Sequence, residues 1–209
     1  MDFVKVLLVN GSPKKNGCTY TALAEVSKEL EANGIQTEIF HIGTKAIGGC
    51  LGCGYCRKEG KCVQDDIVNT VIEKFKEADG YVFGSPVHYA SASGGITAFL
   101  DRMFYIASKH FADKPGAAIV SCRRGGASAA FDQLNKYFTI ANMPVVSSQY
   151  WNMVHGNTPE EVAKDEEGMQ TMRTLGKNMA WILKCIEAGD KLGVKRPERE
   201  QKIATNYIR

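Results

Sequence analysis

Short apolar runs that alternate with segments of helical periodicity are the feature that most restricts the fold of this chain. The first run, residues 3–10 (FVKVLLVN), is apolar at almost every position, as in a strand buried on both faces of a parallel sheet. Strands are predicted at 3–10, 35–42, 81–83, 117–122 and 144–150. Helices are predicted at 19–32, 67–78, 95–108, 129–141 and 158–188, the last interrupted near Gly168. This alternation indicates an α/β fold with helices on both faces of a parallel sheet.

The number of strands and the handedness of their connections restrict the topology further. Five strands joined by right-handed crossovers favour the order 2-1-3-4-5 of a flavodoxin-like three-layer sandwich. In such a sheet, a ligand binds beyond the carboxyl ends of the strands, at the point where the strand order reverses. The loops at 11–19 and 84–95, together with the loop after the fourth strand, therefore form the candidate site.

Length, hydrophobicity and charge exclude several classes of protein. The 209 residues suffice for one domain, predicted at 1–190 with a cysteine-bearing insertion at 44–66, followed by a basic tail at 191–209. The chain lacks the aromatic-interleaved basic patch that is typical of nucleic-acid recognition. It also lacks an apolar stretch of about 18 residues and a recognisable signal peptide. With an odd number of cysteines, seven, these observations predict a cytoplasmic protein that binds neither nucleic acid nor membrane.

The loop after the first strand has the composition of a phosphate site. It reads GSPKKNGCTY and leads into a helix whose free N–H groups and positive dipole end suit an anion. It contains neither a Walker Gly-Lys-Ser/Thr nor the dinucleotide fingerprint G-x-G-x-x-G, and its hydroxyls suit the terminal phosphate of FMN. The alternative is an ordinary helix cap with turn residues. The candidate FMN-binding residues here are Ser12, Lys14, Asn16, Cys18, Thr19 and Tyr20.

Two further loops are predicted to reach the flavin ring. Pro86 stiffens the loop after the third strand, so that the backbone and aromatic side chains of 87–89 are expected to meet the ring. After the fourth strand, two glycines allow close backbone approach, and Arg123 or Arg124 binds a nicotinamide phosphate or balances the charge of reduced flavin. Surface packing of the aromatic side chains and a solvated arginine pair are the alternatives. The candidates are Pro86, Val87, His88, Tyr89, Ser121, Arg124, Gly125 and Gly126.

Four of the seven cysteines fall in one short segment of the insertion. The spacing C-x2-C-x2-C-x5-C from Cys50 to Cys62 suits four thiolates that wrap one centre, at the same sheet edge as the phosphate loop. A [4Fe–4S] cluster is the main hypothesis, and zinc, redox-active thiols and remnants that bind nothing are the alternatives. The other three cysteines, Cys18, Cys122 and Cys185, are expected to be small buried hydrophobic side chains. The candidate cluster ligands are Cys50, Cys53, Cys56 and Cys62.

Taken together, these residues resemble the NADPH-dependent FMN reductase family, in the branch that contains the iron–sulfur flavoproteins. The resemblance rests on GSP at 11–13 followed by Asn16 and Gly17, on GSPV at 84–87 with FLDR at 99–102, and on the glycine pair at 125–126. It covers residues 3–185 and implies a flavodoxin-like fold, FMN at three loops, a cluster on the four cysteines, and dimers or tetramers. Cys18 and the pair at 88–89 depart from the family pattern, and they bear on the substrate rather than on the cofactor.

The sequence therefore predicts an FMN-dependent oxidoreductase that takes hydride from NAD(P)H and passes electrons to a small-molecule acceptor or a redox protein. The flavin carries the chemistry, and no protein residue is predicted to act as a nucleophile or acid–base catalyst. The alternatives are an iron–sulfur flavoprotein that carries electrons without small-molecule turnover, and a flavin-binding sensor. A homodimer or homotetramer is expected.

Overall fold

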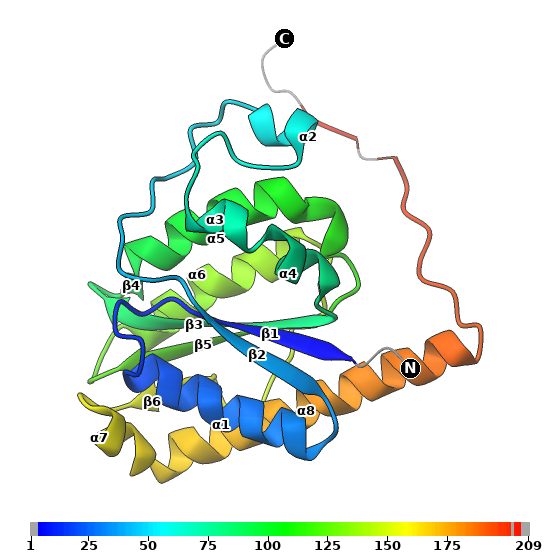
Figure 1. Ribbon diagram of the computed structural model, residues 1–209. Helices are drawn as coiled ribbons and strands as arrows, with labels where there is room; N and C mark the ends of the chain where they lie inside the picture. Colours follow the sequence, from blue (N-terminus) through cyan, green and yellow to red (C-terminus); the bar gives the residue numbers. More distant parts are fainter. Residues whose placement is uncertain (1–3, 202, 206–209) are drawn as a thin grey trace.

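The computed structural model describes residues 4–201 and 203–205, and it has a six-stranded sheet between two layers of helices (Figure 1). Five strands are parallel and lie in the order β2-β1-β3-β5-β6, whereas β4 pairs antiparallel with β3. The strands are β1 (Lys5–Asn10), β2 (Gln36–His41), β3 (Gly80–His88), β4 (Ser91–Ala92), β5 (Gly116–Cys122) and β6 (Met153–His155). The helices are α1 (Cys18–Ala32), α2 (Tyr55–Glu59), α3 (Ile67–Thr70), α4 (Ile72–Glu77), α5 (Gly94–Ala107), η1 (Ser108–His110), α6 (Ala127–Ile140), α7 (Pro159–Ala163) and α8 (Glu166–Lys191). The predicted α/β fold is confirmed, and the parallel strands follow the predicted order when β4 is left out.

Helices cover both faces of the sheet (Figure 1), and the sheet separates two apolar cores. One core lies between the sheet and helices α1, α7 and α8, and the other lies between the sheet and helices α3 to α6. β1 contributes to both, since Val6 and Leu8 point into the first core and Leu7 and Val9 into the second. Burial on both faces explains why residues 6–9 are all apolar.

The registers bring the carboxyl ends of the strands to one edge of the sheet. Asn10 at the end of β1 pairs with His41 on β2 and with Gly84 on β3. Farther along the sheet, Cys122 at the end of β5 pairs with His155 at the end of β6. The loops that follow β1, β3, β5 and β6 therefore meet at this edge, as the predicted topology requires.

The third strand is longer than predicted. Residues 81–83 were expected to end at the Gly-Ser-Pro that follows, but β3 continues to His88. The physical reason is that Gly84 serves close packing instead of a turn. A Cβ at this position would lie 2.8 Å from Cγ2 of Thr19 and 2.9 Å from Cδ1 of Leu23, both in α1.

The fifth strand was predicted at 144–150, and this prediction is wrong. Val145 forms only an isolated bridge with Gly116, and regular pairing with β5 begins at Met153. Between them the chain leaves the sheet, and the side-chain Nδ2 of Asn152 donates a hydrogen bond of 3.1 Å to the carbonyl of Ala118. The Asn152 side chain thus makes the hydrogen bond to the Ala118 carbonyl that the backbone of a fifth strand would otherwise make. A pattern of apolar residues does not predict such a side-chain contact.

Two predicted helices are each divided into two. The segment 67–78 forms α3 and α4, because the β-branched Val71 between them leaves helical geometry. Asp66 caps α3, since its side chain accepts a hydrogen bond from the Val68 N–H in the first turn of that helix. The final helix is interrupted at 164–165 and not at Gly168. Asp165 accepts a hydrogen bond of 3.0 Å from the Gly168 N–H, so it starts α8 as its N-cap.

The segments outside the sandwich include the insertion and the tail. The insertion at 44–66, which was expected to be irregular, contains the short helix α2. The tail leaves α8 at Lys191, and in its described part, 192–201 and 203–205, the chain forms no helix or strand. Arg199 of the tail forms an ion pair of 2.6 Å with Asp113. Two basic residues of the predicted tail, Lys202 and Arg209, lie outside the described residues, and so does residue 3 of the first predicted strand.

Within the part of the chain that the structure describes, no helix combines the length and the apolar character needed to cross a membrane.

Candidate functional site

A pocket of about 260 Å³ opens where the carboxyl ends of β1, β3 and β5 meet the amino-terminal end of α1. We call it the carboxyl-edge pocket. Eight of the fourteen predicted cofactor-binding residues line it: Ser12, Lys14, Cys18, Thr19, Pro86, Val87, His88 and Ser121. Five further residues also line it, among them Arg123, which the sequence offered as the alternative to Arg124: Pro13, Cys122, Arg123, Gly156 and Asn157. The other six predicted residues lie outside this lining: Asn16, Tyr20, Tyr89, Arg124, Gly125 and Gly126.

The loop between β1 and α1 is held in a curled shape by its own side chains. Asn10 is buried, its Oδ1 accepts the Ser12 N–H at 3.0 Å, and its Nδ2 donates to the Lys15 carbonyl at 2.9 Å. The Ser12 hydroxyl accepts the Lys14 N–H at 3.1 Å, and Nε2 of His41 donates to the Ser12 carbonyl at 2.8 Å. These bonds fix the loop without a ligand, so the pocket is pre-organised.

The pocket is suited to an anion. The N-cap of α1 is Gly17, which has no side chain to satisfy the first N–H groups of the helix, and these groups carry its positive dipole end. Lys14 and Arg123 add two cationic side chains to the lining. Among the described residues that line the pocket, none carries a carboxylate. Backbone donors, cations and a helix terminus together form the environment that a phosphate requires.

Two hydroxyls tie the wall of the pocket together. The Thr19 and Ser121 side chains are 1% and 4% exposed, and their hydroxyl oxygens lie 2.8 Å apart, so that one donates to the other. This contact joins the first turn of α1 to the carboxyl end of β5. A pair of hydroxyls has two hydrogens and uses one between its members, which leaves the second for an acceptor in the pocket.

The two cysteines of the pocket are not activated thiols. Burial raises the pKa of the Cys18 thiol, and burial likewise raises the pKa of the Cys122 thiol, so both favour the neutral form at pH 7. Cys122 is buried as predicted, and Cys18 is half-buried with its Sγ 3.8 Å from the Gly156 carbonyl. Cys185 was expected to be buried but is exposed on α8, because it does not belong to the apolar face that packs on α1.

The segment after β3 forms a tight hairpin at the rim of the pocket. His88 on β3 pairs with Ser91 on β4, and the two residues between them, Tyr89 and Ala90, have φ values of 50° and 59°. This left-handed pair is the geometry of a type I′ turn, which two residues with side chains rarely adopt. Gly126 packs directly against this turn, since a Cβ at Gly126 would lie 2.7 Å from Cα of Ala90. The predicted Gly126 therefore supports the hairpin, while Tyr89 points into solvent.

A second pocket, of about 310 Å³, adjoins the first beside the segment that follows β2 and the start of α5. Pro13 and His88 line both pockets, so a ligand that leaves the carboxyl-edge pocket on this side enters the second. Its other walls are residues 42–47 and the glycines at 94–95. An extended ligand with an anionic end and a flat end can therefore occupy the two pockets together.

All four cysteines of the C-x2-C-x2-C-x5-C segment line a third pocket, of about 190 Å³, which we call the cysteine pocket. Its floor is formed by Arg102, Tyr105 and Ile106 of α5. The segment begins at the carboxyl edge after β2, as predicted, but its cysteines share a pocket with residues of α5. Its helix α2 lies above α5 and away from the loop between β1 and α1 (Figure 1). In the described ranges, no three His, Cys, Asp or Glu side chains lie close enough to hold a single metal ion.

Sequence reasoning missed two residues that shape these pockets, Asn10 and Arg102, and left a third, Arg123, as one of two alternatives. Asn10 was assigned only to the first strand. However, Asn-Gly at the end of a strand is typical of a turn in which the asparagine side chain hydrogen-bonds to the backbone. Arg123 and not Arg124 lines the carboxyl-edge pocket, a choice that only the loop conformation decides. Arg102 was noticed only as part of a sequence motif, yet it is the buried charge at the centre of the cysteine segment.

Comparison with known proteins places the chain among flavin proteins. The model of the NADPH-dependent FMN reductase family matches residues 4–158. An iron-sulfur flavoprotein of Methanocaldococcus jannaschii is 32% identical over 192 residues, which is 88% of this chain and 100% of that protein. An iron-sulfur flavoprotein of Methanosarcina thermophila is 30% identical over 192 residues, covering 88% of this chain and 97% of that protein.

Solved structures with the same fold are more distant in sequence. RosB with a bound intermediate, 8-demethyl-8-formylriboflavin-5'-phosphate, superposes with a TM-score of 0.68 at 14% identity, over 99% of this chain and 92% of that one. The apo form of an NADH:FMN oxidoreductase has a TM-score of 0.61 at 17% identity, over 85% and 89%. A flavodoxin from the domain Archaea has a TM-score of 0.60 at 15% identity, over 87% and 99%. These similarities confirm the flavodoxin-like fold.

Proposed function

The chain belongs to the NADPH-dependent FMN reductase family, and on this premise we propose that it is an FMN-dependent oxidoreductase that passes electrons from NAD(P)H to a small-molecule or protein acceptor. The observation that carries the proposal is the carboxyl-edge pocket. There, a glycine-capped helix terminus, a pre-organised loop and two cations converge at the point where the strand order reverses.

The residues of the first loop fit the phosphate of FMN. In this proposal the phosphate lies at the start of α1, where backbone N–H groups and the hydroxyls of Ser12 and Thr19 donate to it, and Lys14 balances its charge. Asn16 and Tyr20 belong to the same segment but do not line the pocket. The hydroxyl pair of Thr19 and Ser121 supports this assignment, because it offers one unused hydrogen to an acceptor.

The flavin ring is proposed to cross residues 86–88 toward the second pocket. The hairpin and the loop at 121–126 hold the ring edge, and Gly125 with Gly126 lets the backbone come close. When bound, FMN supplies the redox chemistry, since its ring accepts hydride from a nicotinamide and passes electrons on. The protein positions the ring, excludes water on the buried side and places Arg123 and Lys14 as countercharges.

A [4Fe–4S] cluster on Cys50, Cys53, Cys56 and Cys62 is the second part of the proposal. The donor set supports it, because four thiols of one short segment line one pocket and thiolates are the ligands of such clusters. The Gly52 N–H lies 3.5 Å from Sγ of Cys50 and is the kind of backbone donor that surrounds cluster sulfurs. The relatives from Methanocaldococcus jannaschii and Methanosarcina thermophila are iron-sulfur flavoproteins, which supports the same assignment.

A pure electron carrier is the second candidate function. It is favoured by the rim of the cysteine pocket, where Leu51 is 68% and Tyr105 is 57% exposed, as in a surface that docks a redox protein. The partner would be another redox protein, and a homodimer or homotetramer with reducing, cytoplasmic surroundings is proposed on the basis of the seven free cysteines and the family.

Anaerobic turnover distinguishes the two functions. FMN-loaded protein is mixed with NADH or NADPH, and the visible absorption of the flavin is followed with and without a quinone. An oxidoreductase consumes nicotinamide continuously when the quinone is present. A carrier is reduced by a partner protein but consumes almost no nicotinamide, and this result would overturn the first function in favour of the second.

A further inference from the structure

Arg102 is a buried charge in the middle of the otherwise apolar face of α5. Its side chain is 1% exposed, and it has the largest side chain among the fully buried residues. A buried guanidinium destabilises a fold unless it is paired and fully hydrogen-bonded. Arg102 meets both conditions.

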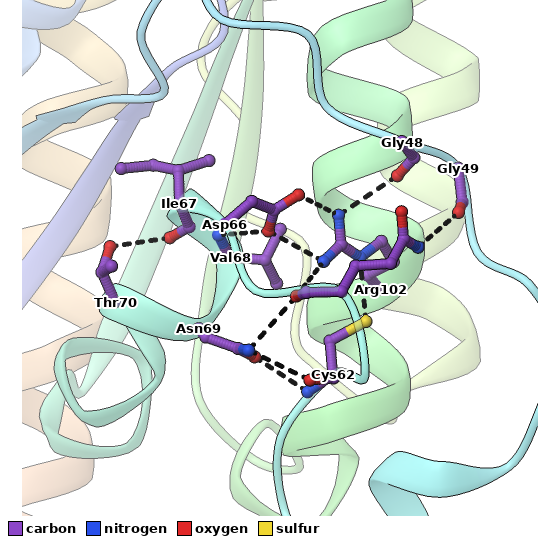
Figure 2. Close-up of polar contacts among 10 residues, drawn as sticks. Gly48, Gly49, Cys62, Asp66, Ile67, Val68, Asn69, Thr70 and Arg102 are labelled. Atoms are coloured by element: carbon purple, nitrogen blue, oxygen red, sulfur yellow. Dashed lines mark hydrogen bonds and ion pairs between the residues drawn. The ribbon is translucent and has the colours of Figure 1, made fainter.

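Asp66 is the partner that neutralises the charge. Its carboxylate receives both terminal nitrogens of Arg102, with Nη1–Oδ2 at 2.6 Å and Nη2–Oδ1 at 2.8 Å, in the two-pronged geometry of the strongest arginine pairs (Figure 2). The same carboxylate accepts the Val68 N–H at 3.1 Å and so caps α3. The ion pair thus fixes α5 to the start of α3.

The remaining donors of Arg102 hold both ends of the cysteine segment. Nη1 donates to the Gly48 carbonyl at 3.2 Å, before the first cysteine, and Nη2 donates to the Gln64 carbonyl at 3.1 Å, after the last. Nε donates to Sγ of Cys62 at 3.2 Å. Five hydrogen bonds therefore match the five N–H donors of a guanidinium (Figure 2).

Cys62 is the one cysteine of the four that is held from two sides. Asn69 of α3 accepts the Cys62 N–H at 2.8 Å and donates to the Cys62 carbonyl at 3.0 Å, while Arg102 holds the sulfur (Figure 2). Cys50 and Cys53 are exposed, and the sulfur of Cys50 has a backbone donor within its own turn. The structure therefore has one pre-positioned thiol, toward which the other three would close.

We propose that Arg102 is a positioning residue that pre-organises Cys62 as the first ligand of the cluster and raises the reduction potential of that cluster through its Nε–H···S hydrogen bond. The inference rests on the proposed cluster. Hydrogen bonds to ligand sulfurs stabilise the more negative, reduced form of a cluster and so raise its potential. Asp66 offsets the net charge of the guanidinium, which leaves the directed hydrogen bond as the main influence on the sulfur.

The same helix connects the two proposed redox sites. Gly94 at the start of α5 lines the second pocket, and Arg102 lies eight residues farther along, about 12 Å at the rise of an α-helix. The Ser93 N-cap of α5 donates to the Gly11 carbonyl at 2.7 Å, which anchors the helix to the phosphate loop. A change at Arg102 is therefore expected to act at the cysteine pocket while the flavin end of α5 stays in place.

Two sets of substitutions and one control test the inference. Arg102→Lys keeps a cation but places its donors on a single nitrogen. It therefore cannot bond both oxygens of Asp66 and the sulfur of Cys62 at the same time. Arg102→Met combined with Asp66→Asn removes both charges and keeps a side chain that caps α3, so no lone buried charge prevents folding. Arg173→Gln removes an ion pair with Glu25 on the opposite face of the sheet and serves as the matched control.

The measurements use FMN-loaded protein that is reconstituted anaerobically with iron and sulfide. We expect both Arg102 variants to lose iron to a chelator about tenfold or more faster than the wild type and the control, as when a hydrogen bond to a metal ligand is lost. For Arg102→Lys, the potential of the cluster, measured by EPR during a dye-mediated titration, is expected to fall. FMN content is expected to equal that of the wild type.

Equal iron-loss rates and equal potentials in wild type and Arg102→Lys overturn the inference. Wild-type protein that takes up no iron overturns the proposed cluster instead, together with the effect on its potential. In that case the metal-free protein decides the positioning role. Alkylation of Cys62, measured by mass spectrometry relative to Cys50, is expected to be faster in Arg102→Lys than in the wild type, and equal relative rates overturn the positioning role as well.

Discussion

The contact between Thr19 and Ser121 supports a quantitative prediction, because both hydroxyls are buried and one donates to the other at 2.8 Å. Thr19→Ala removes one hydroxyl and leaves the Ser121 hydroxyl buried without its partner. An unpaired buried hydroxyl destabilises a protein by about 1–3 kcal/mol. We therefore expect the free energy of unfolding of the flavin-free protein to fall by about this amount for Thr19→Ala, and by a similar amount for Ser121→Ala.

The double variant separates the hydrogen bond from other effects. When both hydroxyls are removed, neither is left unpaired, so the double variant should be more stable than the sum of the two single effects predicts, by about 1 kcal/mol. Thr19→Ser keeps the hydroxyl and loses only the methyl group that packs beneath Gly84, so it separates packing from hydrogen bonding. Denaturant unfolding followed by circular dichroism gives all the free energies.

FMN affinity gives the functional side of the same prediction. Loss of one charge-assisted donor to the phosphate is worth about 1.5–3 kcal/mol, so Thr19→Ala should raise the Kd for FMN by roughly tenfold or more, while Thr19→Ser stays near the wild type. Quenching of flavin fluorescence measures the Kd. Additive stability effects in the cycle, or an unchanged Kd in Thr19→Ala, would refute the reasoning.

Two further predictions concern the hairpin rim and the cysteine segment. Gly126→Ala places a side chain at φ 88° and a Cβ 2.7 Å from Cα of Ala90, so it should lower the free energy of unfolding by about 1–2 kcal/mol or more and weaken FMN binding. Gly125→Ala, with no atom within 4 Å of the added Cβ, is the matched control for stability, and equal thermal unfolding of the two variants would contradict the packing argument. Cys53→Ser should abolish bound iron in the reconstituted protein while FMN stays bound, as iron and flavin assays measure; iron retained at the wild-type level would count against the four-thiolate site.

The fold was predictable where its signals are local. The first strand and the helix after it follow from a run of apolar residues buried on both faces and from an Asn-Gly helix end, and both lie where predicted. The Asp66 cap was predictable because its partner is two residues away. The fifth strand was not, because the Ala118 carbonyl is satisfied by the side chain of Asn152, a contact between residues far apart in sequence.

The candidate site shows the same division. The phosphate loop could be recognised from glycines, hydroxyls and a helix start that are contiguous in the sequence, and Ser12, Lys14 and Thr19 line one pocket. By contrast, Gly84 has the same appearance in the sequence whether it forms a turn or packs against a helix. The link between Arg102 and Cys62 spans forty residues, and no local pattern reports it.

Flavin titration of the purified, flavin-free protein tests the central claim most directly. FMN and riboflavin differ by one phosphate, and at least two charge-assisted hydrogen bonds to that group should make FMN binding roughly 100-fold tighter or more. We predict that FMN binds with one equivalent per chain and that riboflavin binds at least about 100-fold more weakly. Equal affinity for the two flavins, or binding of neither, would contradict the assignment of the carboxyl-edge pocket to the phosphate of FMN.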